Sequence, residues 1–353
     1  MNLTKSHPDL FFSITYYIML AAAIFFMLIL SGCKDQNDLI LAPESNRYFD
    51  SSFISYGSYI QSSIPVSILD RVMFNQDNRA LIYWYNISPS DVRVKDILGG
   101  DTKVEPDQAN VPVLDIVFDP SQNGIYNTAS LAANPADNWG GLFRHLPKEI
   151  SKQAQSKNLV MNIWIKLVDA PANATLFVDL GQISEDIIPN GKLDTEDKNQ
   201  NGLIDAGEDT GIDGLYDIAE PGYNAQTNPD PNHDDFYYKL NGDYSHVNGL
   251  EGNSVSVDLG KLPNSEDINR NFTLDQSNNY YSYLIPLDTN KINQNKIVEH
   301  GKNGWFKLKI PVDLPDFKVG NLNKSNIETM RLWIFNVSQK VHIRIAEIKF
   351  DAL

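Results

Sequence analysis

The stretch Leu159-Val-Met-Asn-Ile-Trp-Ile-Lys-Leu167 decides the fold, because its apolar side chains alternate with other residues along its whole length. Leucine, methionine and isoleucine occupy the odd positions, whereas Asn162, Trp164 and Lys166 occupy even ones. An alternation with a period of two places successive side chains on opposite faces of a β-strand. The stretch therefore predicts a strand that packs an aliphatic face against a core.

Similar alternation recurs on both sides of this stretch. It is found in residues 79–85, 111–119, 175–180, 280–287, 305–312, 330–335 and 341–350. In the last segment the apolar parity moves from odd to even positions, which predicts a β-bulge near Ala346-Glu347. Residues 148–155 are the best helix candidate. Eight or so strands separated by turn-rich loops predict an all-β protein, a jelly-roll-like β-sandwich with a long acidic, calcium-binding loop insertion.

That insertion spans residues 181–279, which are rich in Asp, Asn, Gly and Pro. The formal net charge of −16 is concentrated there, because residues 185–275 contain 20 Asp and Glu against 5 Lys and Arg. An irregular segment of this length inside a compact domain needs something to order it. Cations fit such a segment, whereas a nucleic acid does not, since few basic residues are available to neutralise phosphates.

Residues 197–208 carry the pattern of the twelve-residue EF-hand calcium loop. Gly202 stands at position 6, where the loop must turn sharply. Side-chain oxygens fill positions 1, 3, 5, 9 and 12, and a backbone carbonyl serves position 7. The predicted ligands are Asp197, Asn199, Asn201, Leu203 (through its carbonyl), Asp205 and Glu208. The expected cofactor is Ca²⁺.

A second frame follows at once, with Gly211 in place of a ligand at position 3 and Gly214 at position 6. Its predicted ligands are Asp209, Asp213, Asp217 and Glu220. No helix fits between Glu208 and Asp209, and Pro221-Gly222 stops a helix from leaving the second frame. Calcium is therefore expected to order irregular chain, a structural role, and not to open a helix pair as in a sensor.

A third frame is weaker. Oxygens stand at positions 1, 3, 5 and 9, contributed by Asp267, Asn269, Asn271 and Asp275. Phe272 replaces the turn glycine and Asn278 replaces the bidentate glutamate. The alternative for all three frames is a solvated acidic loop in which Asp, Asn and Gly are simply turn formers.

The N-terminus predicts export and lipidation. Residues 11–30 form an apolar run long enough to span a membrane, and the run ends in Leu-Ser-Gly before Cys33, the single cysteine of the chain. This ending resembles the lipobox of bacterial lipoproteins, which implies a signal peptide over residues 1–32 and a lipidated Cys33 followed by a tether to residue 46. The polar residues 34–38 resemble a surface-export tag. The alternative is an uncleaved signal anchor.

Several blocks of the remaining domain, residues 47–353, resemble the SprA family, very large outer-membrane translocon proteins of type 9 secretion and gliding motility. They occur in the family's order. The matching text is Arg79-Ala-Leu-Ile-Tyr-Trp-Tyr-Asn-Ile-Ser-Pro89, Trp139-Gly-Gly-Leu-Phe-Arg144, Phe177-Val-Asp-Leu-Gly-Gln-Ile-Ser-Glu-Asp-Ile187, Leu262-Pro-Asn-Ser-Glu-Asp-Ile-Asn269, Tyr280-Tyr-Ser-Tyr-Leu-Ile-Pro-Leu-Asp288 and residues 326–350.

The chain is too short for the family's membrane barrel, so cargo conduction is not carried over. The resemblance implies one extramembrane β-sandwich region: a non-enzymatic, calcium-stabilised docking module of the outer membrane, on the cell surface or the periplasmic face. Its expected partners are lipid through Cys33 and components of the secretion or gliding machinery.

Nothing else in the sequence predicts catalysis. The six histidines lack metalloprotease spacing, and no nucleophile elbow, phosphate loop or dinucleotide fingerprint occurs. The alternative function is a surface lipoprotein that binds glycans, with Trp139, Trp164, Trp305 and Trp333 as stacking platforms. Trp164, Trp305 and Trp333 lie opposite the aliphatic face of their strands, so a second buried face, covered by the insertion, explains them equally well.

Overall fold

The computed structural model describes residues 49–66, 73–156, 158–239, 242–255, 262–292 and 296–352. All of them lie within the contact unit Tyr48–Leu353. The predicted signal peptide, Cys33 and the tether fall outside the described residues. Within the described part, no helix combines the length and the apolar character needed to cross a bilayer.

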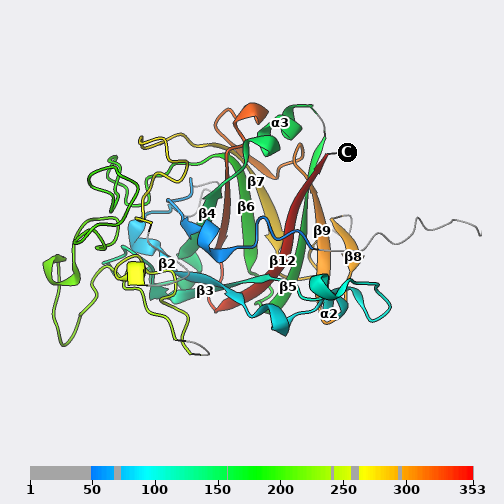
Figure 1. Cartoon of the computed structure of the whole chain (residues 1–353), viewed down its shortest axis with the longest axis horizontal. Coiled ribbons are helices and arrows are strands. Elements are labelled where there is room, and N and C mark those ends of the chain that lie inside the picture. Colours follow the sequence, from blue (N-terminus) through cyan, green and yellow to red (C-terminus); the bar gives the residue numbers. More distant parts are fainter. Residues whose placement is uncertain are drawn as a thin grey trace, which may run out of the picture. The chain divides into compact units, whose positions relative to one another are not determined.

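Two six-stranded antiparallel sheets form the framework (Figure 1). In spatial order, the β6 sheet contains β1 (Ile60–Gln61), β4 (Trp139–His145), β11 (Thr329–Phe335), β6 (Thr175–Gln182), β7 (Asn279–Pro286) and β10 (Phe317–Val319). The β5 sheet contains β2 (Ala80–Ile87), β3 (Val113–Asn123), β12 (Val341–Ala352), β5 (Leu159–Asp169), β9 (Trp305–Pro311) and β8 (Ile297–His300). The all-β, jelly-roll-like sandwich is confirmed.

The core lies where the alternation places it. Met161, Ile163 and Ile165 of β5 are buried in the same cluster as Leu176 and Val178 of β6, so aliphatic faces from both sheets meet. Burial of such side chains is the main stabilising term of the sandwich. The predicted bulge is also confirmed, because the register of β12 against β5 shifts between Ile345 and Glu347.

The helix α3 (Lys148–Ser156) is confirmed, whereas other elements escaped the sequence reading. The helix α2 (Val94–Leu98), the short edge strands β1, β8 and β10, and most of β4 were not expected. Residues 136–141 read as loop because of their glycines. Yet a Cβ atom at Gly140 would lie 2.9 Å from the ring of Phe118. Glycine at this position therefore lets β4 approach β3 closely.

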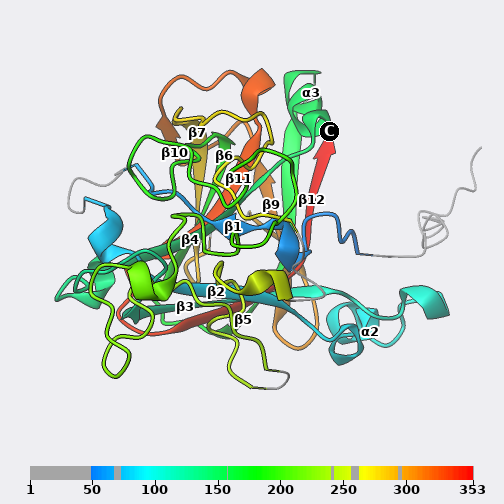
Figure 2. The same ribbon diagram turned by 60° about the vertical axis from the view of Figure 1, so that its left-hand side comes forward.

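The acidic insertion connects β6 to β7. Its described residues between 183 and 278 form no α-helix and no strand ladder, only the 3₁₀ turns Asp217–Ala219 and Asn253–Val255 and isolated bridges. Figure 2 shows these loops gathered over the part of the sandwich that contains β1, β4 and β2. The expected absence of a helix between the first two calcium frames holds for residues 197–220.

Candidate metal centre

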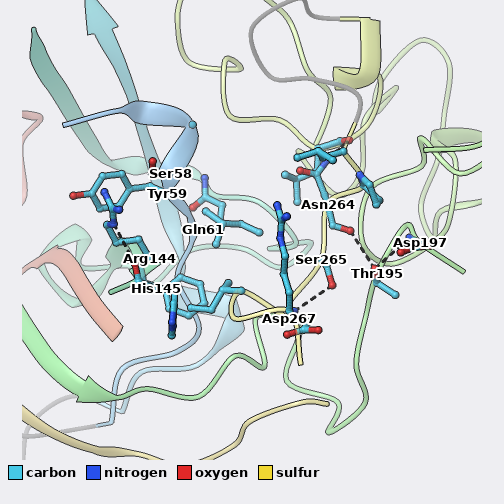
Figure 3. A pocket seen from close by; sticks show the side chains of 18 of the residues that line it. Ser58, Tyr59, Gln61, Arg144, His145, Thr195, Asp197, Asn264, Ser265 and Asp267 are labelled. Carbon is cyan, nitrogen blue, oxygen red and sulfur yellow. Dashed lines mark hydrogen bonds between the residues drawn. The ribbon is translucent and has the colours of Figure 1, made fainter. Parts of the chain in front are cut away.

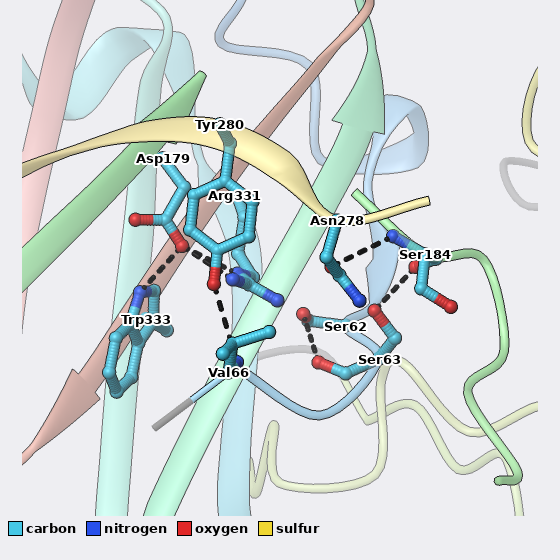
Figure 4. A network of polar contacts seen from close by, with 9 residues as sticks. All are labelled: Ser62, Ser63, Val66, Asp179, Ser184, Asn278, Tyr280, Arg331 and Trp333. Atoms are coloured by element: carbon cyan, nitrogen blue, oxygen red, sulfur yellow. Dashed lines mark hydrogen bonds and ion pairs between the residues drawn. The ribbon is translucent and has the colours of Figure 1, made fainter. Parts of the chain in front are cut away.

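A buried ion pair stands in the β6 sheet (Figure 4). Asp179 on β6 accepts hydrogen bonds through Oδ2 from Nε and Nη2 of Arg331, at 2.8 and 2.6 Å, and from Nε1 of Trp333 at 2.9 Å. All three side chains are buried. The hydrogen bonds keep the charges of Asp179 and Arg331 compensated inside the sandwich.

The two ends of the insertion are fixed to one another beside this pair. The carbonyl of Ser184 accepts a hydrogen bond from Ser63 Oγ at 2.5 Å, and the Ser184 amide donates to Asn278 Oδ1 at 3.3 Å. Figure 4 shows these contacts next to Tyr280, whose hydroxyl accepts a hydrogen bond from the amide of Val66. The insertion therefore begins and ends at one anchored point.

The first loop, residues 197–208, folds around its own carboxylates. Asp197 accepts hydrogen bonds from the amides of Asn201 (2.9 Å) and Gly202 (2.8 Å). Glu208 accepts them from the amides of Lys198 (3.2 Å) and Asp205 (2.8 Å). Gly202 adopts a φ of 74°, the left-handed turn that position 6 requires. Positions 1 and 12 thus close the loop as its pattern predicts.

The side chains at positions 3, 5 and 9 converge in this loop. Nδ2 of Asn199 and Nδ2 of Asn201 both donate to Asp205 Oδ2, at 2.7 and 2.9 Å. Ca²⁺ prefers carboxylate and amide oxygens. The donor set fits the ion, which would replace these two N–H donors at Asp205 and meet amide oxygens in their place.

The third loop repeats this geometry. Asp267 accepts hydrogen bonds from the amides of Asn271 (2.9 Å) and Phe272 (2.6 Å). Asn269 and Asn271 both donate to Asp275 Oδ2, at 2.7 and 3.1 Å. Phe272 has a φ of 63°, so phenylalanine takes the conformation expected of glycine. The turn therefore forms without glycine, at a strain of about 1 kcal/mol.

The missing glutamate of the third loop comes from elsewhere in the chain. Glu185 Oε2 accepts a hydrogen bond from the Asp275 amide at 3.2 Å, the contact that Glu208 makes with Asp205 in the first loop. The Glu185 amide in turn donates to the carbonyl of Asp275 at 2.7 Å. Asn278, which stands at position 12 in the sequence, instead binds Ser184. Glu185 is a candidate ligand that the sequence reading missed.

A fourth loop, residues 186–194, exchanges glutamates with the third loop. Glu266, which precedes the third loop, accepts hydrogen bonds from the amides of Asp194 and Ile188, both at 2.9 Å. Asp186 and Asn190 take the places of positions 1 and 5, and Asn190 Nδ2 donates to Asp194 Oδ2 at 2.6 Å. Each of these two loops therefore receives the glutamate that precedes the other.

The signal for this exchange was present in the sequence as an unrecognised repeat. Residues 184–194, 195–205 and 265–275 read SEDIIPNGKLD, TEDKNQNGLID and SEDINRNFTLD, with Glu, Asp, Asn and Asp at the same four positions. The repeated glutamates, Glu185, Glu196 and Glu266, are all buried. Burial raises the pKa of Glu185 and of Glu196 to about 7 and that of Glu266 to about 8.

The second frame does not close on itself as the first loop does, and its metal ligands stay a prediction. The Asp209 carboxylate accepts hydrogen bonds from the Gly252 amide, at 3.1 Å, and from Ser254 Oγ. Asp213 and Glu220 gather instead with Asp234, a residue that the sequence reading did not single out.

A cleft of about 530 Å³ lies between these loops and the sandwich (Figure 3). One wall contains residues 56–61 together with Arg144 and His145. Asp197 of the first loop and Asp267 of the third line the opposite wall. The conformation of the two loops therefore shapes the cleft.

The structure contradicts the tryptophan platforms. Trp139, Trp164, Trp305 and Trp333 are all buried. Trp164 and Trp305 pack in one cluster with apolar residues of the segment 87–113, and Trp139 and Trp333 pack with Phe74, Phe177 and Phe335. No described residue of the insertion belongs to either cluster, so the apolar contacts of these tryptophans come from elsewhere in the described chain.

A row of tyrosines was missed. Tyr83 and Tyr85 on β2 stack at 6.4 Å between ring centroids, Tyr85 stacks on Tyr244 at 4.3 Å, and Tyr238 lies 6.0 Å from Tyr244. Tyr238 is exposed, and Tyr83, Tyr85 and Tyr244 are partly so.

Comparisons with known proteins support the resemblance found in the sequence. The family SprA_N, described as a motility related/secretion protein, matches residues 217–351, which include part of the insertion and the strands β7 to β12. The chain therefore resembles SprA over this region. No curated protein matches the chain.

Solved structures show only a distant likeness. A family 11 carbohydrate-binding module of the cellulosomal cellulase Lic26A-Cel5E of Clostridium thermocellum aligns with a TM-score of 0.27 and 11% identity, over 83% of this chain and 96% of that chain. A carbohydrate-binding module specific for non-crystalline cellulose, CBM28, aligns with a TM-score of 0.26 and 10% identity, over 83% and 98%. Scores this low support no inference about function.

Proposed function

We propose that this chain is a non-enzymatic, lipid-anchored docking module of the outer membrane, an accessory of the type 9 secretion and gliding machinery whose docking face Ca²⁺ stabilises. The observation that carries the proposal is the match of residues 217–351 to a motility and secretion family. The anchor is Cys33, by the resemblance of the N-terminus to a lipoprotein signal.

The insertion supplies the docking face. Of the large apolar side chains that are exposed among the described residues, nine belong to it: Leu203, Leu215, Tyr216, Ile218, Tyr223, Tyr237, Tyr238, Leu262 and Phe272. Exposed apolar side chains within a polar surround are typical of protein interaction sites. The surround here is strongly acidic, so the partner surface should combine apolar pockets with a basic rim.

Calcium contributes by holding these loops in one conformation. The first and third loops each direct carboxylate and amide groups toward a common point, and Leu203 and Phe272 belong to the same two loops. A flexible surface would have to be ordered on binding, at a cost in affinity. Bound calcium meets that cost before the partner arrives.

An affinity pull-down from native outer membranes tests the proposal. The immobilised chain should recover secretion or gliding components in calcium and lose them in chelator. Ile218→Ser and Leu262→Ser, at side chains 75% and 54% exposed, should reduce recovery at least tenfold. Leu314→Ser, 70% exposed but outside the insertion, is the matched control and should have no effect. Recovery that is equal for all variants would contradict the proposal.

The tyrosine row favours a second candidate function, glycan binding. Aromatic rings that are partly exposed can stack on sugar rings. A glycan array with the wild-type chain and with Tyr238→Ala separates the two functions. Sugar binding that Tyr238→Ala abolishes, without recovery of any translocon component in the pull-down, would favour the glycan-binding function.

A further inference from the structure

A second group of carboxylates belongs to neither the first nor the third loop. It contains Asp213, Asp217, Glu220, Asp230, Asp234, Asp235 and Glu251. These residues form three triads, and in each triad one oxygen atom of every residue lies within 4.8 Å of the other two. The inner triad is Asp213, Glu220 and Asp234, the outer triad is Asp217, Asp235 and Glu251, and Asp217, Glu220 and Asp230 connect them.

The inner triad contains buried oxygens without a hydrogen-bond partner. Asp234 is 0% exposed; its Oδ2 accepts a hydrogen bond from the Tyr126 hydroxyl, and its Oδ1 has no partner. Glu220 is 4% exposed; its Oε2 accepts from the Asn232 amide, and its Oε1 has no partner. A buried carboxylate oxygen left unsatisfied is costly, so a cation that contacts these atoms would stabilise the fold.

The outer triad also contains buried oxygens that lack a hydrogen-bond partner. Oδ1 of Asp217 and Oε2 of Glu251 are buried and lack a partner. In the described part of the chain, no ion pair joins any of the seven carboxylates to a Lys, Arg or His side chain. Burial and the neighbouring carboxylates raise the pKa of Glu251 to about 8. The carboxylates here thus outnumber the cationic side chains near them, which include Lys198 beside Asp213 and His246 beside Asp235.

We propose that this group binds two Ca²⁺ ions, one at the inner triad and one at the outer triad, with Asp217, Glu220 and Asp230 between them. The donors are all carboxylate oxygens in an irregular arrangement, which suits Ca²⁺, whereas Zn²⁺ prefers nitrogen and sulfur and Mg²⁺ demands regular octahedral geometry. The site deepens the proposed calcium-dependent docking function and rests on it for the identity of the ion.

The two ions would tie three distant stretches of the insertion to the sandwich. Tyr126, close after β3, connects them: its hydroxyl donates to Asp234 at 2.9 Å and accepts from the Ile212 amide at 3.0 Å, and its own amide donates to the Asn232 carbonyl at 2.6 Å. Ions at the two triads would join residues 213–220, residues 230–235 and Glu251 around this tyrosine. The exposed Leu215, Tyr216 and Ile218 lie on the first of these stretches.

Calcium content of the full chain, purified in detergent and dialysed against CaCl₂, tests the proposal. Asp234→Asn should lose at least one Ca²⁺ per chain relative to wild type, and Glu251→Gln should lose one as well. Asp205→Asn, in the first loop, should lose a different ion, so that its loss adds to that of Asp234→Asn. Asp101→Asn, at an exposed site outside the insertion, should lose none. Unchanged content in both Asp234→Asn and Glu251→Gln would overturn the proposal, as would binding of Mg²⁺ from MgCl₂ in place of Ca²⁺.

Thermal unfolding distinguishes a lost ion from a damaged fold. In chelator, Asp234→Asn should unfold at the same temperature as wild type or higher, because it removes an uncompensated buried charge. In calcium it should unfold at a lower temperature than wild type. A loss of equal size in both conditions would assign Asp234 a packing role and overturn the site. Intact calcium content together with a failed pull-down would instead contradict the docking function.

Discussion

The sandwich and the insertion bury carboxylates in opposite ways. In the sandwich, buried Asp179 is held by Arg331, and buried Asp115 faces His342 and Arg344. In the insertion, the buried Glu185 and the other repeat glutamates accept hydrogen bonds from backbone amides, with no cationic side chain in an ion pair among the described residues. The sandwich therefore compensates its own charge, whereas in the insertion we propose that bound Ca²⁺ performs that task.

The sandwich also contains more buried apolar side chains than the insertion. The main core cluster contains residues of both sheets and none of the described residues between 183 and 278. A smaller cluster joins Ile183, Ile187, Ile212 and Leu250 to Phe143 and Tyr280 of the sandwich. The insertion thus has little hydrophobic stabilisation of its own, and its stability should depend on calcium where that of the sandwich does not.

The largest change in unfolding free energy is expected in the sandwich, from Arg331→Ala. This substitution leaves Asp179 buried without its partner, which should cost about 3 to 5 kcal/mol of unfolding free energy, equally with and without calcium. Urea denaturation measures it. Lys349→Ala, which removes an exposed pair with Asp351, is the control and should change stability by less than about 0.5 kcal/mol. A strong calcium dependence of the Arg331→Ala effect would contradict the conclusion that the sandwich compensates its buried charges by itself.

In the insertion, Glu185→Gln should remove about 2 kcal/mol of stability in saturating calcium, because the third loop loses a charged hydrogen-bond acceptor and a calcium ligand. In chelator the loss should disappear. Calorimetric titration should show one calcium site fewer than in wild type. Glu149→Gln, on the exposed face of α3, is the matched control. Equal titration curves for the two variants would show that Glu185 does not serve the third loop.

The two regions should also respond differently to pH. In chelator, burial raises the pKa of Glu185 to about 7 and that of Glu266 to about 8, above values of about 4.3 in an unfolded chain. At pH values between the unfolded and the folded pKa, the folded protein binds more protons than the unfolded chain. The free energy of unfolding should therefore fall as the pH rises from 5 to 8. Bound calcium keeps the carboxylates ionised, so in calcium stability should instead fall as the pH decreases. Melting temperatures at several pH values test this, and parallel trends in both conditions would contradict it.

The smallest effect is expected from substitutions at two equivalent turns, at position 6 of the first and third loops. Phe272→Gly should relieve left-handed strain and stabilise the third loop by about 1 kcal/mol, whereas Gly202→Ala should introduce strain and destabilise the first loop by a similar amount. Calcium affinity should rise about fivefold in the former and fall about fivefold in the latter. Calcium titration measures both changes, and effects of the same sign would show that the two turns are not equivalent.

The sandwich could be predicted from sequence because its signal is local. The alternation in β5 and the parity change at Ala346 read directly as strand and bulge. Strand β4 could not be read, because Gly140 and Gly141 fit both a loop and a close packing contact. The buried tryptophans were ambiguous for a related reason: an indole that faces away from one core can face a second one.

The metal centre could be predicted only in part. The first loop was recognised because all its candidate ligands lie within twelve residues. Glu185 and Glu266 reach loops about 80 to 90 residues away, and Asp234 joins Asp213 through the folding of the insertion. Contacts between residues so far apart in the chain produce no fixed spacing that a sequence motif could reveal. The repeat at residues 184, 195 and 265 was the one available sign of the exchange.

Amide hydrogen exchange tests the central claim most directly. The full chain is compared in calcium and in chelator, with β5 and β11 as an internal reference for the sandwich. We expect the amides of residues 184–278 to lose at least tenfold protection in chelator, while those of β5 and β11 keep theirs. Equal protection of residues 184–278 in both conditions would show that the insertion folds without cations and would contradict the account.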